Sequence, residues 1–241
     1  MRGCVTGRLS GMPAKGSVDP MAPPAIREVK ANSILNRSGI SDYAVNCYTG
    51  CQHGCLYCYA RFMAEYTGHT EAWGDFVDVK VNGPDLLRRQ VSKVRPGREF
   101  LSSVCDGWQP LEANYLLTKQ CLEILVSSGF SVSILTKSTL ARRDFPVMRR
   151  GHDLTFGVTV TTVDERVRRL MEPRVPTGLN RLDLIKQAKD AGIRTSVFMG
   201  PLLPFLSDRG APLERLVKAV AGASPDSVCV DVLNPRRGVW Q

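Results

Sequence analysis

The chain has 241 residues, is 43% hydrophobic and carries a formal net charge of +9. It can build one substantial core, so its eight cysteines do not indicate a small secreted scaffold held by disulfides. It has no apolar run of about 18 residues that could span a membrane, and its beginning lacks the apolar block of a signal peptide. We therefore expect a cytoplasmic protein with no membrane partner, in which clustered cysteines favour metal binding.

The first 28 residues are rich in glycine and proline, so we expect a flexible arm over 1–28 and one core domain over 29–241. Short stretches rich in β-branched or aromatic residues predict strands at 42–48, 99–105, 131–136, 154–161, 193–199 and 227–233. Between them, apolar residues at helical spacing predict helices over 84–94, 111–128 and 179–191.

Strands that alternate with helices form right-handed βαβ units and a parallel sheet, either open or curled into a partial barrel. In both arrangements, the loops that leave the carboxyl ends of the strands form the active face. Reactive and polar residues follow the predicted strands at these ends: the cysteine cluster, Cys105, Asp106, Lys137, Thr161, Thr162 and Asn234.

The stretch CYTGCQHGCLYCY at 47–59 contains four cysteines. Cys51, Cys55 and Cys58 have the spacing C-x3-C-x2-C, and their thiolates are soft ligands that suit iron–sulfur clusters or zinc. Three thiolates on a four-iron cubane leave one iron open to a small molecule. With Cys47 as a fourth ligand the stretch could instead bind zinc, although it fits no common zinc spacing.

This motif after the first strand, with Tyr57 just before the last cysteine, resembles the signature of the radical S-adenosylmethionine (SAM) enzymes. The resemblance narrows to the spore photoproduct lyase-like branch over about 32–234, in the blocks SILNRSGISDYAVNCYTGCQHGCLYCYAR, SSVCDGWQPLE, ILTKS, FGVTVTT, EPRVPTGLNRL and FMGPLLP.

The resemblance implies a partial (β/α)6 parallel barrel and a 4Fe-4S cluster held by Cys51, Cys55 and Cys58, with SAM on the open iron. In that family, an electron from the cluster cleaves SAM to a 5′-deoxyadenosyl radical, which abstracts hydrogen from the substrate. A fourth thiolate would block SAM, so we expect Cys47 to be a packing residue.

Several further roles carry over by resemblance. Tyr59 follows the last cysteine and is expected near SAM, either in hydrogen or electron transfer or in packing. Asp106 matches an aspartate that contacts SAM, and Lys137 matches a lysine that reaches the SAM carboxylate. Thr159 and Thr161 resemble the residues of a strand that touches SAM.

Other matched residues are expected to be structural. Tyr57 is expected to pack against the cluster, while Glu172 and Arg181 are expected to form an ion pair that ties down a loop. Cys105 lies near the position of the hydrogen-donor cysteine of spore photoproduct lyases, but the strict spacing falls nearer Ser103. It is therefore either a hydrogen donor or a buried inert thiol.

Three functional hypotheses follow. The favoured one is a radical SAM enzyme that acts on an unidentified substrate and receives electrons from a donor such as flavodoxin or ferredoxin. The second is repair of thymine lesions in DNA with Cys105 as hydrogen donor; the positive charge supports it, but the lyases carry a DNA-contacting portion beyond the sixth strand, whereas this sequence ends at Gln241. The third is a non-catalytic metal-binding protein that binds nucleic acid.

Overall fold

The computed structural model describes residues 24–233, and its main element is a seven-stranded sheet in the order β10-β9-β8-β7-β6-β3-β2. β3 is parallel to β6, and the parallel pairing continues through β10, whereas β2 (Leu35–Arg37) pairs antiparallel with β3. The parallel strands are β3 (Tyr43–Val45), β6 (Arg98–Leu101), β7 (Ser131–Thr136), β8 (Leu154–Thr159), β9 (Arg194–Leu202) and β10 (Ser227–Val232). They confirm the six predicted strands and form the expected partial barrel.

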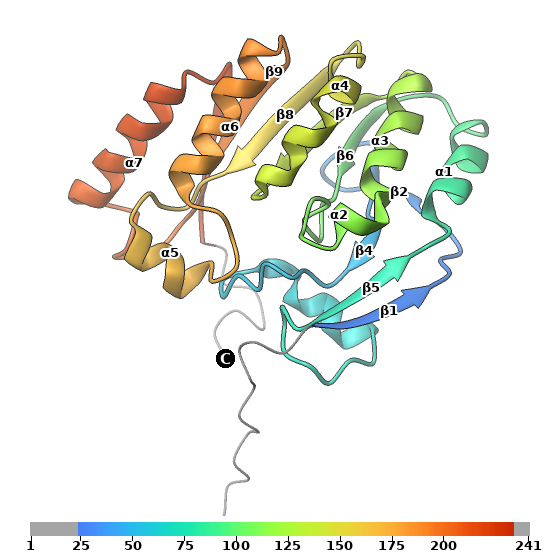
Figure 1. Cartoon of the computed structure of the whole chain (residues 1–241), viewed down its shortest axis with the longest axis horizontal. Helices are drawn as coiled ribbons and strands as arrows, with labels where there is room; N and C mark the ends of the chain where they lie inside the picture. The colour runs from blue at the N-terminus through green and yellow to red at the C-terminus, as the bar shows by residue number, and fades with distance from the viewer. Residues whose placement is uncertain (1–23, 234–241) are drawn as a thin grey trace, which may run out of the picture.

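Helices connect these strands, and most of them lie along the outer face of the curved sheet (Figure 1). They are α1 (Gly83–Val91), α2 (Glu112–Tyr115), α3 (Leu117–Ser127), α4 (Phe145–Met148), α5 (Glu165–Met171), α6 (Gly178–Asp190) and α7 (Gly210–Ala223), with 3-10 helices η1 (Tyr59–Tyr66) and η2 (Thr139–Asp144). Their apolar faces bury residues such as Leu122, Leu125 and Ile185 completely, and this burial holds the helices on the sheet.

The helix predicted over 111–128 is interrupted. Leu116 takes a left-handed conformation with φ 55°, so α2 ends before it and α3 begins after it. The cause lies in Glu112, whose carboxylate accepts hydrogen bonds from the backbone N–H groups of Thr118 and Lys119. These N–H groups belong to the first turn of α3, where they lack partners within the helix, so Glu112 acts as the cap.

A second, smaller sheet has the order β1-β5-β4. It contains β4 (Tyr48–Thr49), which separates from β3 within the strand predicted at 42–48, together with β1 (Ala25–Val29) and β5 (Phe76–Lys80). β1 pairs with β5 along its whole length, and the side chain of Arg27 in β1 donates a hydrogen bond to Asp78 in β5. Folded structure therefore begins inside the segment expected to be an arm over 1–28; residues 1–23 and 234–241, including Asn234, lie outside the described residues.

The carboxyl ends of the parallel strands face the cyan η1 and the gold α5 in Figure 1, and the cysteine loop joins β4 to η1 at this end. β6 is shorter than predicted: it ends at Leu101, and Ser102 has φ 69°. Cys105 consequently lies in a loop rather than at a strand end. In residues 24–233, no helix is both long and apolar enough to cross a membrane.

Candidate metal centre and cofactor site

The cysteine loop contains two tight backbone turns. The N–H of Gly54 donates to the carbonyl of Cys51 at 3.2 Å, and the N–H of Cys58 donates to the carbonyl of Cys55 at 3.2 Å. Cys51 and Cys55 are buried, and Cys58 is half-buried. All three thiols are free. The sequence spacing therefore produces a compact loop that carries three sulfur atoms.

The loop is anchored at two sides of the barrel. The N–H of Gln52 donates to Oε1 of Gln109, which follows β6, at 2.8 Å. The N–H of Leu56 donates to the carbonyl of Met171, at the end of α5, at 2.9 Å. These bonds hold the cysteines against the carboxyl ends of the strands.

Burial keeps the cysteine thiols protonated in the metal-free protein. It raises the pKa of Cys51, Cys55 and Cys58, with that of Cys55 reaching about 12, although the nearby charge of Lys137 opposes the rise for Cys55 and Cys58. Cys55 and Tyr57 pack with Val175 in a small apolar cluster that excludes water. Thiols bind metal as thiolates, so metal must displace their protons.

The donor set fits an iron–sulfur cluster. Within residues 24–233, no three His, Cys, Asp or Glu side chains are arranged to hold a single metal ion. In a cubane, each thiolate ligates a different iron, so the sulfur atoms stand farther apart than ligands around one ion. Three soft sulfur donors on one loop, two of them buried and one half-buried, suit such a cluster.

Cys47 lies apart from this donor set. Its side chain is fully buried in the main core, where its sulfur lies 3.5 Å from that of Cys121. This contact supports the expected packing role and leaves the four-thiolate zinc hypothesis without its fourth ligand.

Asp106 connects several parts of the site. Its Oδ1 accepts hydrogen bonds from the hydroxyl of Thr136 at 2.7 Å and the N–H of Trp108 at 2.9 Å. Its Oδ2 accepts one from the N–H of Lys137 at 2.7 Å and lies 3.4 Å from Nδ1 of His53. Burial alone would raise the pKa of Asp106, but His53 and these hydrogen bonds outweigh it and hold the pKa well below its ordinary value.

A carboxylate offers about four lone-pair positions, and four groups surround Asp106. We therefore infer that Asp106 fixes the end of β7, while the contact with SAM that the resemblance implied stays a prediction. Sequence reasoning missed His53, because a single histidine between two cysteines carries no periodic signal. Its position inside the motif was the one available clue.

Lys137 projects from the end of β7 toward the cysteine loop. Its Nζ lies 5.7 Å from the centroid of the Tyr57 ring, and its charge influences Cys55 and Cys58. The structure thus brings together the lysine and the cysteines that were predicted to share a site.

A buried polar network lies beneath Tyr57. The Tyr57 hydroxyl donates to Glu172 and lies 3.0 Å from the hydroxyl of Thr161, which in turn donates to the carbonyl of Gly200 at 2.9 Å. Glu172 also forms an ion pair with Arg181, and both side chains are fully buried. The expected Glu172–Arg181 pair is therefore confirmed, and it holds Tyr57 in place.

Thr159 lies in β8, whereas Thr161, which the predicted strand over 154–161 also included, does not. β8 ends at Thr159, and Thr161 lies two residues beyond it. The carbonyl of Thr159 accepts a hydrogen bond from Nη1 of Arg181 at 2.6 Å. Both side chains are buried, so the structure places them in the wall under the site.

Tyr59 and Cys105 lie on the side of the site nearest β6. Tyr59 is 44% exposed, and its hydroxyl donates to the carbonyl of Ser103. The sulfur of Cys105 lies 3.9 Å from Oδ1 of Asn46, which also accepts the N–H of Val104 at 3.0 Å. Burial raises the pKa of Cys105 to about 12, so the residue stays a thiol at neutral pH.

The basic side chains that could contact an anionic partner divide between two ends of the barrel. Arg88 and Arg89 occupy the last turn of α1, and Arg149 follows α4, so they lie toward the amino ends of the next strands. Arg166 and Arg169 belong to α5, which follows β8 on the side of the cysteine loop (Figure 1). The basic side chains therefore do not all converge on the site.

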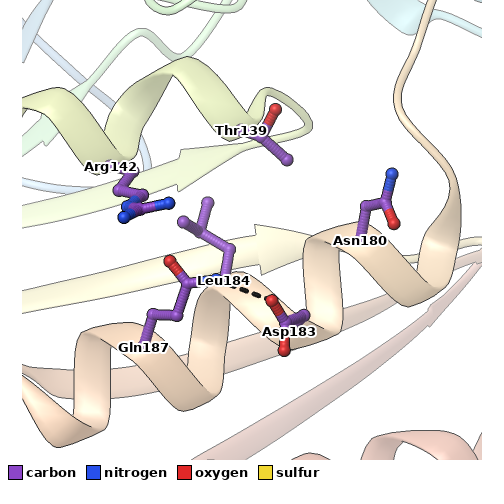
Figure 2. Close-up of a pocket in the computed structure, with 6 residues that line it drawn as sticks. All are labelled: Thr139, Arg142, Asn180, Asp183, Leu184 and Gln187. Carbon is purple, nitrogen blue, oxygen red and sulfur yellow. Dashed lines mark hydrogen bonds between the residues drawn. The ribbon is translucent and has the colours of Figure 1, made fainter.

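A surface groove between η2 and α6 contains none of the predicted site residues. It is lined by Thr139, Arg142, Asn180, Asp183, Leu184 and Gln187, and Gln187 donates to Asp183 at 2.6 Å (Figure 2). We assign it no part in the chemistry.

Comparisons with known proteins agree with this geometry. The Radical SAM superfamily matches residues 45–217, and the chain therefore belongs to that superfamily. Its enzymes bind a 4Fe-4S cluster and SAM.

The chain is 34% identical to an uncharacterised protein of Methanocaldococcus jannaschii over 185 residues, which cover 76% of this chain and 70% of that protein. It is 32% identical to an uncharacterised protein of Mycobacterium tuberculosis over 248 residues, covering 95% and 73%.

Among solved structures, a spore photoproduct lyase variant with bound AdoMet and dinucleoside spore photoproduct matches with a TM-score of 0.67 at 14% identity. The match covers 89% of this chain and 63% of that one. At this identity, the likeness supports the fold alone, and the chain spans less than two thirds of the lyase.

Proposed function

We propose that this radical SAM enzyme uses Cys51, Cys55 and Cys58 to hold a 4Fe-4S cluster with one iron open to SAM, and that it abstracts hydrogen from an unidentified substrate. The observation that carries the proposal is the three-cysteine loop beside Lys137 at the carboxyl ends of the strands. When bound, the cluster supplies the electron that cleaves SAM to a 5′-deoxyadenosyl radical.

In this proposal, the chain's own residues orient SAM and exclude water. Lys137 pairs with the carboxylate of SAM, since an ammonium group is a suitable partner for it. Asp106 is a positioning residue: it holds the N–H of Lys137 and the ring of His53. Tyr59, Thr159 and Thr161 form the surrounding wall, with Tyr59 the most exposed of the three.

The proposed electron donor is a flavodoxin or ferredoxin, and the proposed location is the cytoplasm, where buried free thiols such as Cys55 stay reduced. Anaerobic reconstitution with iron and sulfide, reduction and addition of SAM should yield 5′-deoxyadenosine. A protein with a full 4Fe-4S cluster that forms none would refute the proposal.

A second candidate is repair of thymine lesions in DNA, with Cys105 as hydrogen donor. One observation favours it: the raised pKa of Cys105 preserves the S–H bond that a hydrogen-atom donor needs. DNA that contains spore photoproduct should then be restored to thymines, and Cys105→Ala should repair it less cleanly. Equal repair by Cys105→Ala would remove the thiol from the mechanism.

The non-catalytic hypothesis finds no support, because the chain belongs to an enzyme superfamily. Nucleic acid is kept as a candidate substrate of the enzyme. Arg166 and Arg169 on α5 are the basic residues best placed to contact it.

A further inference from the structure

Two buried carboxylates share one arginine. Glu112 in α2 and Asp144 at the end of η2 have fully buried side chains, and Arg143 forms an ion pair with each of them. Nε and Nη2 of Arg143 donate to the two oxygens of Asp144, each at 2.8 Å. Nη2 also donates to Oε1 of Glu112 at 3.2 Å, and Nη1 donates to the carbonyl of Glu112 at 3.1 Å. Burying a carboxylate without a partner is costly, so Arg143 allows both groups to stay buried.

Glu112 extends these contacts to the strand that leads into the cysteine loop. Its Oε2 accepts a hydrogen bond from the hydroxyl of Tyr48, which lies in β4 and is fully buried. β4 ends at Thr49, just before Cys51. Arg143 therefore reaches the beginning of the cysteine loop through one carboxylate.

Asp144 extends the contacts in the other direction, toward Lys137. Its Oδ2 accepts the indole N–H of Trp108 at 2.8 Å, and the Trp108 side chain is fully buried. The backbone N–H of Trp108 donates to Oδ1 of Asp106, and Oδ2 of Asp106 accepts the N–H of Lys137. Direct hydrogen bonds thus connect Arg143 to the end of β7 through three residues.

We propose that Arg143 is a positioning residue for SAM, because the Arg143 network (Tyr48, Glu112, Arg143, Asp144 and Trp108) fixes the cysteine loop relative to Lys137. The inference rests on the proposed function, in which SAM contacts both the open iron and Lys137, so a change in their relative position weakens binding. The Arg143 side chain is 26% exposed, whereas the other members of the network are fully buried. It is therefore the member that can be substituted with least disturbance of the core.

The guanidinium group suits this role because it donates hydrogen bonds in a rigid, planar fork. Arg143→Lys keeps the positive charge but leaves one ammonium group, which cannot bond both carboxylates and the Glu112 carbonyl in the same geometry. Arg142→Lys is the matched control. Arg142 precedes Arg143 on η2, is exposed, and lines the surface groove between η2 and α6 (Figure 2).

The first test is hydrogen exchange of the metal-free protein, measured by mass spectrometry of its peptides. Arg143→Lys should speed exchange about tenfold in the peptides that contain Gln52 and Lys137, both outside the Arg143 network, because charge-assisted hydrogen bonds are lost. Arg142→Lys should leave exchange in these peptides unchanged. Unchanged exchange in Arg143→Lys overturns the inference. So does an equal rise in the peptides of α7, because it would mean a loss of global stability alone.

The second test is SAM binding to the reduced, reconstituted protein, followed by the change in its electron paramagnetic resonance (EPR) spectrum. Arg143→Lys should raise the dissociation constant of SAM about tenfold at an unchanged iron content, whereas Arg142→Lys should not. Val220→Ala removes core packing on α7, so it controls for lost stability and should leave the dissociation constant unchanged. A wild-type dissociation constant in Arg143→Lys, or an equal rise in Val220→Ala, overturns the inference.

Trp108→Phe tests the same network at its other end. It keeps the aromatic packing but removes the indole N–H that bonds Asp144, so it should also weaken SAM binding. In the double variant with Arg143→Lys the two effects should not add, since both break one network. If Arg143→Lys does not fold, Trp108→Phe decides alone. Wild-type SAM binding in Trp108→Phe, or full additivity in the double variant, overturns the inference.

The two proposals can fail separately. A wild-type protein with a full 4Fe-4S cluster that binds no SAM refutes the proposed function and this inference together. A wild-type protein that binds SAM, with an Arg143→Lys variant that binds it equally tightly, refutes only the inference.

Discussion

The sulfur atoms of Cys47 and Cys121 lie 3.5 Å apart in the main core, and both side chains are fully buried. Cys55 and Cys58 instead belong to a separate apolar cluster near α5. Of the cysteines at 47–58, Cys47 thus lies in the main core, apart from the loop proposed to hold the cluster.

This division predicts opposite results for two similar substitutions. Cys47→Ala should leave the iron and sulfide content of the reconstituted protein unchanged and cost about 1–2 kcal/mol of stability through a small cavity. Cys55→Ala should lose the cluster. Iron and sulfide analysis with chemical denaturation measures both effects, and loss of iron from Cys47→Ala would contradict the assignment.

Thiol alkylation should distinguish the cysteines in the metal-free native protein. Burial raises the pKa of Cys55 and Cys105 to about 12, so both should react slowly with iodoacetamide at pH 7.5 and faster as the pH rises. Cys229, exposed on β10, is the internal control and should react first. Cluster assembly should protect Cys55 but not Cys229, as peptide mass spectrometry can show; equal protection of both would argue against the site.

Asp106→Asn should destabilise the protein by about 2 kcal/mol, because it weakens hydrogen bonds to a charged, buried acceptor. The pKa of Asp106 is lowered from 3.8, so its charged form stabilises the fold above pH about 4, and this contribution is lost as the pH falls through the lowered pKa. The difference in unfolding free energy between wild type and Asp106→Asn should therefore shrink from pH 7 to pH 3.

Asp85→Asn is the matched control for that measurement. The Asp85 side chain is 70% exposed and pairs with Arg88 on the surface, so its loss should cost well under about 1 kcal/mol. A difference for Asp106→Asn that is equally small, or that does not change with pH, would show that the charge of Asp106 contributes little to stability.

Breaking the buried Glu172–Arg181 ion pair should lower the free energy of unfolding more than Asp106→Asn does. Glu172→Gln leaves the Arg181 charge uncompensated where no solvent reaches it, and we expect a loss of about 3–5 kcal/mol. The double variant Glu172→Gln/Arg181→Met removes that charge and should recover part of the loss in urea denaturation. A double variant less stable than Glu172→Gln would contradict this explanation.

The six parallel strands could be predicted because each is a short β-rich run between helical stretches. The small sheet could not, since β1 is only five residues long and its partner β5 lies 51 residues away in sequence. The break at Leu116 also escaped prediction, because apolar spacing continues across it. It depends on where the Glu112 carboxylate lies in three dimensions.

The candidate site, like the fold, could be predicted from the sequence only in part. Motif spacing predicted the cysteines as ligands, and block resemblance predicted Lys137 beside them. Whether Asp106 still has free lone pairs depends on four neighbours from three segments, which spacing does not reveal.

The central claim is that Cys51, Cys55 and Cys58 hold a cluster whose remaining iron is open to SAM. EPR spectroscopy of the reduced, reconstituted protein titrated with SAM tests it most directly. The account predicts that SAM changes the spectrum of the cluster at saturation, in the wild type and equally in Cys47→Ala. A fully loaded cluster whose spectrum is unaffected by saturating SAM, or one that depends on Cys47, would contradict it.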